Sequence, residues 1–285
     1  MSDAPAMRLL AHRPFALYFW ARGFSRFAAQ VATVALGWQI YALTGSAFHL
    51  GLVGLVQFLP TAVLTFFAGH AADRYDRKRV VQICQIVQGL AAAYLAWGTW
   101  EGWVGVEQIY LVVAIFGAAT AFEAPASAAL LPGVAPEGQL QRATALSTGI
   151  FQVAVISGPA LGGFAYAVSP VLPYAIMAGC WVLGGFLNGA IRIDRPVEAK
   201  APPELADLFA GVGFVRRNPS ILGTISLDLF AVLLGGATAL LPIYARDILQ
   251  TGPWGLGVLR AAPAVGALAM TAFLARHPVE RRVGI

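Results

Sequence analysis

The sequence predicts an all-α integral membrane protein, and two observations indicate this class: composition and the length of the apolar runs. Of its 285 residues, 58% are hydrophobic and 12% are charged, and the mean hydropathy is +0.70. Soluble proteins carry about 25% charged residues, and disordered chains combine low hydrophobicity with high charge, so neither class fits. Eight apolar runs have at least the length, about 20 residues, that a helix needs to cross a bilayer: 15–43, 50–72, 80–100, 109–131, 143–168, 172–191, 221–244 and 256–274.

The distribution of positive charge predicts how these helices are oriented. With the N-terminus in the cytoplasm, 15 of the 19 Lys and Arg residues fall in cytoplasmic segments and only Arg246 falls outside. Cytoplasmic loops of membrane proteins are enriched in Lys and Arg. We therefore expect a multi-pass protein of the plasma or inner membrane with both termini in the cytoplasm. The basic pI of about 9.5 then reflects topology, since a basic, aromatic-rich face for nucleic acid is missing.

A polar stretch divides the chain into three parts. Residues 1–192 hold six runs, 193–219 form a linker that includes an expected amphipathic helix over 203–217, and 220–285 hold the last two runs. The segment around Gly51 resembles the segment around Gly257, at an offset of 206 residues. Transporters are often built from such repeats, and two repeats of this length need about 410 residues. We therefore expect the chain to stop after the eighth of twelve helices.

A basic motif links the second run to the third. Five of its positions have a fixed spacing: Gly69, Asp73, Arg74, Arg77 and Lys78. The motif closely resembles the loop between helices 2 and 3 of the major facilitator superfamily, G-x-x-x-D-R-x-G-R-K, with Asp76 where glycine is commoner. Asp73 and Arg77 lie one helical turn apart and can pair. The alternative is a generic cluster of charges at a helix end that obeys the positive-inside rule.

A second motif lies in the fifth run. It comprises Gly158, Pro159, Gly162 and Gly163. These residues resemble the G-P-x-x-G-G motif of helix 5 in drug/proton antiporters of the same superfamily, which implies export. The branch that this chain resembles includes siderophore and macrolide exporters. The alternative is a proline-kinked packing helix that has no influence on the direction of transport.

The resemblance implies a complete N-terminal six-helix bundle followed by the first two helices of a C-terminal bundle. It also implies a secondary active transporter, driven by protons or another coupling ion, that moves a small-molecule substrate by alternating access. In the family the aspartate of the loop motif latches onto helix 11, which lies beyond the eighth helix. The helix-4 arginine of the family is replaced by Val113.

Ionisable residues inside membrane spans are costly and are candidates for function. Arg22 and Arg26 on the first run and Glu123 on the fourth lie at similar depth, so an Arg–Glu contact across the first half is expected. Asp228 on the seventh run lies at comparable depth, and in the family helices 1, 4 and 7 line the central cavity. Glu123 and Asp228 are candidates for coupling to protons or cations, the alternative being a structural ion network at the cytoplasmic side.

Further polar residues accompany these candidates in the spans. Arg260 is expected to snorkel to the outer surface or to pair with Asp247. Six glutamines are candidates for lining a cavity, or for helix–helix contacts: Gln30, Gln39, Gln57, Gln85, Gln88 and Gln152.

Several other function classes lack the residues that they need. Lys78 and Lys200 are the only lysines and neither follows a glycine, so no phosphate-binding P-loop for ATP is present. The two cysteines suit neither a disulfide framework nor a metal cluster, and no histidine lies mid-span for haem. We expect no cofactor, no metal and no enzymatic activity. The sequence therefore favours an exporter of hydrophobic or amphipathic molecules, with an importer of a polar solute or a non-transporting membrane fragment as alternatives.

Overall fold

The computed structural model describes residues 9–192 and 215–276, except for the side chains at positions 66, 67, 69–74, 220, 231–237, 272, 275 and 276. The elements in these ranges are all helical: α2 (Arg13–Thr44), α3 (Ala47–Arg74), α4 (Arg77–Glu101), α5 (Val106–Val134), α6 (Leu140–Val168), α7 (Leu172–Gly189), α9 (Pro219–Leu234), η1 (Gly235–Leu240), α10 (Leu241–Ile243), η2 (Tyr244–Ile248) and α11 (Pro253–Arg276). Most of the amphipathic helix expected over 203–217 lies outside the described residues.

The expected membrane class is confirmed. In the described ranges, six helices are long and apolar enough to cross a bilayer: Ala47–Thr65 within α3, then α4, α5, α6 and α7, and Pro253–Thr271 within α11. Two of the eight expected runs are not among these six helices. Helix α2 has ample length at 32 residues but is interrupted by arginines and glutamines. Helix α9 offers only the shorter apolar stretch Ile221–Phe230.

The expectation of one continuous seventh helix over 221–244 is wrong. The α-helix ends at Leu234 and is followed by a 3₁₀-helix, one short α-helical turn and a π-helix that ends at Ile248. Gly235 and Gly236 begin the 3₁₀ segment, and glycine lowers helix stability by about 1 kcal/mol relative to alanine. The chain therefore changes its winding in the middle of the predicted span.

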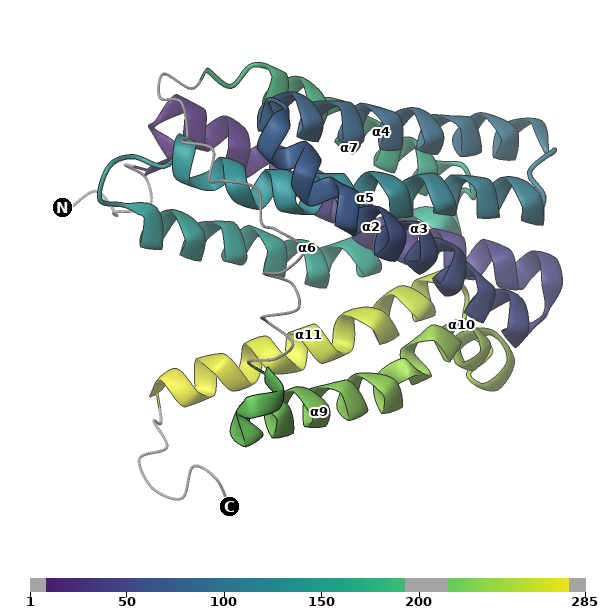
Figure 1. Ribbon diagram of the computed structural model, residues 1–285. Helices are drawn as coiled ribbons and strands as arrows, with labels where there is room; N and C mark the ends of the chain where they lie inside the picture. The colour runs from purple at the N-terminus through teal and green to yellow at the C-terminus, as the bar shows by residue number, and fades with distance from the viewer. Residues whose placement is uncertain (1–8, 193–214, 277–285) are drawn as a thin grey trace.

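Helix α2 is the central element of the first group of helices. It packs against α5, α6 and α7, while α4 packs against α5 and α7, and α3 packs mainly against α5 (Figure 1). The largest buried cluster joins α2, α4, α5 and α7, and there the rings of Phe116 and Trp181 lie 4.7 Å apart. Large apolar side chains on the opposite faces remain exposed, such as Phe58 at 65% and Trp100 at 77%. Because these faces are apolar, they suit contact with lipid.

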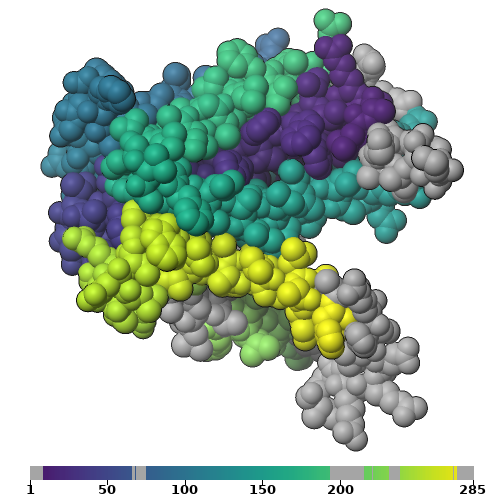
Figure 2. Space-filling view, turned by 180° about the vertical axis from the view of Figure 1, so that it is seen from behind, coloured from purple at the N-terminus to yellow at the C-terminus, as the bar shows by residue number. Residues whose placement is uncertain are grey.

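The later elements, from α9 to α11, contact this group at one end. A buried cluster of Val34, Ala245 and Leu256 connects α2, η2 and the first turns of α11. Helix α11 also packs against α6. Figure 1 shows α6 and α11 converging near α10 and diverging toward their other ends, and Figure 2 shows the groove that opens between them.

Candidate functional site

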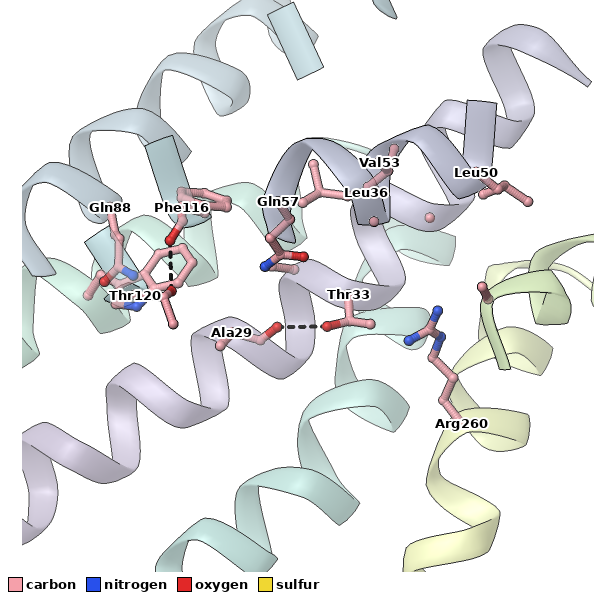
Figure 3. Close-up of a pocket in the computed structure, with 15 residues that line it drawn as sticks. Ala29, Thr33, Leu36, Leu50, Val53, Gln57, Gln88, Phe116, Thr120 and Arg260 are labelled. Carbon is pink, nitrogen blue, oxygen red and sulfur yellow. Dashed lines mark hydrogen bonds between the residues drawn. The ribbon is translucent and has the colours of Figure 1, made fainter. Parts of the chain in front are cut away.

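Two cavities lie between the first group of helices and the later elements. The first has a volume of about 170 Å³ and is lined by α2, α3, α4, α5, α7, η1 and α11. Its walls are mostly apolar, with Leu36, Val53 and Phe116 among them, and polar side chains reach it from Gln57 and Gln88 (Figure 3). Small-molecule sites have this character: concave, largely apolar, with a few polar groups that orient the ligand.

The second cavity lies in the groove between α6 and α11. Its volume is about 440 Å³, and its lining comes from α2 and α6 on one side and from η1, α10 and α11 on the other. Gln30, Gln152 and Arg260 supply polar groups to it, and Arg260 lines both cavities. Helices from both groups thus form one cavity region.

The six glutamines divide between cavity lining and contacts between helices. Gln30, Gln57, Gln88 and Gln152 line the cavities. Gln39 accepts a hydrogen bond from Tyr174, and Gln85 donates one to Glu123. The periodicity of the helices alone could not separate these groups.

Glu123 lies in a polar network in the core, away from the cavities. Its side chain is 6% exposed, and its Oε1 accepts hydrogen bonds from Ser25 Oγ at 2.6 Å and from Gln85 Nε2 at 3.0 Å. Gln85 Oε1 in turn accepts from Asn188 Nδ2 at 2.8 Å. This network joins α2, α4, α5 and α7, so the carboxyl group has neutral hydrogen-bonding partners.

The expected contact between an arginine and Glu123 is not formed. Arg22 donates instead to the Tyr18 hydroxyl at 3.1 Å and to Ser127 Oγ at 3.2 Å, one turn along α5 from Glu123. The Arg26 guanidinium lies 6.0 Å from the centre of the Phe151 ring on α6. Within the described ranges no ion pair joins either arginine to Glu123, because Arg22 meets α5 one turn away from Glu123 and Arg26 faces α6.

Arg260 and Asp247 do not form the pair that the sequence suggested. Asp247 accepts a hydrogen bond from the Tyr41 hydroxyl, and Arg246 donates to the Tyr41 carbonyl at 3.1 Å. Arg260 points from α11 toward α2 and the first cavity, near Thr33 (Figure 3). In the sequence, the place of Arg260 in an apolar span is the only indication that it lines a cavity.

The structure places Asp228 on the first helix of the later group. It lies on α9, its side chain is exposed, and it lines neither of the two cavities. Helix α9 packs mainly against η1.

The basic motif lies at the junction of α3 and α4. Asp76 caps α4 by accepting from the Lys78 backbone N–H at 3.0 Å. Arg77 donates to the Ala129 carbonyl at 3.2 Å, and Lys78 Nζ donates to the Ile191 carbonyl at 3.0 Å. The motif therefore connects the start of α4 to the ends of α5 and α7. The side chains of Gly69, Asp73 and Arg74 lie outside the described residues, as does the expected Asp73–Arg77 pair.

The glycine motif of α6 lies at two helix contacts. A Cβ atom on Gly158 would meet Gln30 Cβ at 2.5 Å, and one on Gly162 would meet Val31 Cα at 3.2 Å, both on α2. A Cβ atom on Gly163 would meet the Pro253 carbonyl at 2.5 Å, on α11. The carbonyl of Pro159 faces Gly257 of α11 in the same way. The motif thus allows close packing of α6 against both groups of helices.

In the part of the chain that the structure describes, no three His, Cys, Asp or Glu side chains lie together in a way that could hold a metal ion.

Comparison with known proteins identifies the family. The family model described as "Major Facilitator Superfamily" matches residues 18–284. The chain is 30% identical over 272 residues to the multidrug efflux pump Tap of Mycobacterium tuberculosis, which covers 89% of this chain and 63% of Tap. It is 23% identical over 257 residues to macrolide efflux protein A of Streptococcus pyogenes, covering 87% of this chain and 63% of that protein. The chain thus spans less than two thirds of the length of these relatives.

Comparison with solved structures indicates the same fold. A crystal structure of a bacterial homologue of the human lysosomal transporter Spinster, in an inward-facing and unoccupied conformation, superposes with a TM-score of 0.74. The sequence identity is 15%, and the match covers all of this chain and 65% of the other. The fold expected from the two motifs is confirmed, and the chain belongs to the Major Facilitator Superfamily.

Proposed function

We propose that the protein is a secondary active transporter that exports small hydrophobic or amphipathic molecules by alternating access. The observation that carries this proposal is the cavity region, which helices of both groups enclose and which apolar residues mostly line. The names of Tap and macrolide efflux protein A support export as the direction. The position of the α6 motif at the contact with α11 supports alternating access, since this contact must change when the two groups rock against each other.

Proton antiport is the proposed source of energy. Glu123 is a buried carboxyl group with neutral partners, and Arg22 lies one turn away along the α2–α5 contact. Intramembrane ionisable groups of this kind mark ion pathways in transporters. We assign proton transfer to Glu123. We assign a supporting electrostatic role to Arg22 and Arg26, and a coupling role to Asp228.

The proposed arrangement in the membrane follows from the charges. The N-terminus lies in the cytoplasm, residues 1–192 form the first half, 193–219 the linker and 220–285 part of the second half. The junction of α3 and α4 is then cytoplasmic, and the Tyr41–Asp247 contact lies at the outer face. Gly69, Asp73, Arg74, Arg77 and Lys78 act as the cytoplasmic gating motif.

Export can be tested in cells. The full-length gene is expressed in a bacterium that lacks its major efflux pumps, and accumulation of a neutral dye, Nile red, and of an anionic dye, carboxyfluorescein supplied as its diacetate ester, is followed by fluorescence. We expect lower steady-state accumulation than with an empty vector, and recovery of accumulation when a protonophore removes the proton gradient. Increased accumulation would indicate uptake instead, and export that persists after the protonophore has removed the proton gradient would point to another ion.

A further inference from the structure

Unpartnered polar atoms are concentrated at the first cavity. Among the residues that the structure describes, seven buried side-chain nitrogen or oxygen atoms have no hydrogen-bond partner. Three of them belong to residues that line this one cavity: Gln88 Oε1, Trp181 Nε1 and Arg260 Nε. Gln88 and Trp181 are each only 2% exposed. Buried polar groups are nearly always hydrogen-bonded, so such a concentration indicates a missing partner.

The charge of the cavity region indicates what that partner is. Arg260 is the cationic residue that lines both cavities, and no Asp or Glu is found among the described residues of either lining. The Arg260 side chain is half-buried and its Nε has no hydrogen-bond partner, and a charge in such surroundings is stabilised by a counter-charge or by hydrogen bonds. The guanidinium group is a planar fork of donors that fits a carboxylate in two-point contact.

The hydrogen-bonding groups occupy separate parts of the cavity. Figure 3 shows Gln88, Phe116 and Thr120 at one end and Arg260 at the other, with α2 and α3 between them. Apolar side chains from Leu36, Val53 and Phe116 form the wall. A ligand that satisfies the whole lining therefore has an anionic end, an apolar body and a group that can hydrogen-bond with an amide and an indole N–H.

We propose that the cavity binds amphipathic organic anions, with a ligand carboxylate on Arg260. This deepens the proposed export function and rests on it for the direction of movement. A cationic ligand of the same size finds a like charge at Arg260 and no carboxylate in the lining, so the cavity discriminates against it. The substrate class thus differs from the one that an acidic cavity would select.

Binding of three probes of the same size and different charge tests this assignment. The full-length protein is purified in a non-ionic detergent and titrated by calorimetry with 1-naphthaleneacetate, 1-naphthaleneacetamide and 2-(1-naphthyl)ethylammonium. We expect the acetate to bind at least tenfold more tightly than the amide, and the ammonium compound to bind most weakly. Equal affinity for acetate and amide, or tighter binding of the ammonium compound, would overturn the proposal.

Variants connect the preference to Arg260. Arg260→Gln removes the charge, and we expect it to abolish the difference between acetate and amide; Arg260→Lys keeps the charge and should retain part of it. Arg142→Gln is the matched control, because Arg142 is exposed at the start of α6 and its loss should leave the preference intact. If Arg260→Gln does not yield folded protein by size-exclusion chromatography, the ranking of the probes on the native protein still decides. An unchanged preference in folded Arg260→Gln would sink the assignment.

The two proposals fail in different ways. Charge-selective binding without lowered dye accumulation in cells would contradict export and leave the anion site standing. Lowered accumulation without charge selectivity would support export and remove the anion site.

Discussion

At the scale of single residues, burial separates groups that the sequence could only place by depth. Glu123 and Arg22 lie at similar depth, yet Glu123 contacts Ser25 and Gln85 while Arg22 contacts Ser127. Arg22 and Ser25 both face α5 but lie about one turn apart, so Arg22 meets Ser127 and Ser25 meets Glu123. Glu123 thereby receives hydrogen bonds from neutral groups only.

The role proposed for Glu123 can be tested by an isosteric change. Glu123→Gln preserves the shape of the side chain and an acceptor for Ser25, but it cannot carry a proton. In liposomes that contain the full-length protein and a pH-sensitive dye, we expect substrate-driven proton movement to fall at least tenfold while substrate binding remains. Glu107→Gln, at the exposed start of the same helix, is the control. Unchanged proton movement in Glu123→Gln would leave the carboxyl group with a structural role only.

At the scale of elements, the contact between α6 and α11 depends on glycine. Gly163 faces Gly257 and the Pro253 carbonyl so closely that a Cβ atom on Gly163 would come within 2.5 Å of that carbonyl oxygen. Small residues allow such close approach of helices in membranes. Since α6 belongs to the first group and α11 to the later elements, these glycines set how closely the two groups can pack.

A larger residue at this contact should separate the two helices. Gly163→Val forces α11 away from α6, and overpacking of this kind costs about 1–3 kcal/mol. We expect a lower midpoint of thermal unfolding in detergent, and weaker export in the accumulation assay. Gly179→Ala on α7 is the matched control, because no atom lies within 4 Å of its added Cβ. Equal melting and export for Gly163→Val and the native protein would show that this contact is adaptable.

At the scale of the whole molecule, the two groups of helices are joined at one end and separated at the other. The joint comprises the Tyr41–Asp247 hydrogen bond, the Arg246 guanidinium 5.5 Å from the Tyr41 ring centre, and the cluster around Val34. The open side is the groove between α6 and α11 (Figure 2). A rocking motion that exposes the cavity on the opposite side has to break this joint.

Removal of one hydroxyl group should loosen the joint. Tyr41→Phe deletes the donor to Asp247 and keeps the ring that faces Arg246. With spin labels on cysteines at the exposed positions Phe48 and Leu249, in a background without other cysteines, we expect a broader distribution that extends to longer distances. Tyr94→Phe, at the Trp103 contact, is the control. An unchanged distribution would show that the apolar cluster alone holds the joint.

Much of this architecture was predictable because hydropathy, charge and motif spacing are properties of the chain itself. Helices α4, α5 and α6 begin and end within a few residues of the expected runs. The break at Gly235 was missed because glycine hardly changes mean hydropathy. Arg260 was assigned to the outer surface because depth along a span does not tell which side of the helix faces a cavity. No pattern in the sequence distinguishes Trp181, since it is an indole in an apolar run.

The six residues of η1 have one mechanical consequence. A 3₁₀-helix rises about 2.0 Å per residue and turns about 120°, against about 1.5 Å and 100° in an α-helix. If η1 became an α-helix, the segment that leads to Asp247 would shorten by about 3 Å, and the residues after η1 would rotate by about 120° about the helix axis. Thr238 and Ala239 of the same segment border the two cavities. A ligand bound in either cavity therefore contacts η1, and the winding of η1 sets the position of Asp247 and of its hydrogen bond with Tyr41.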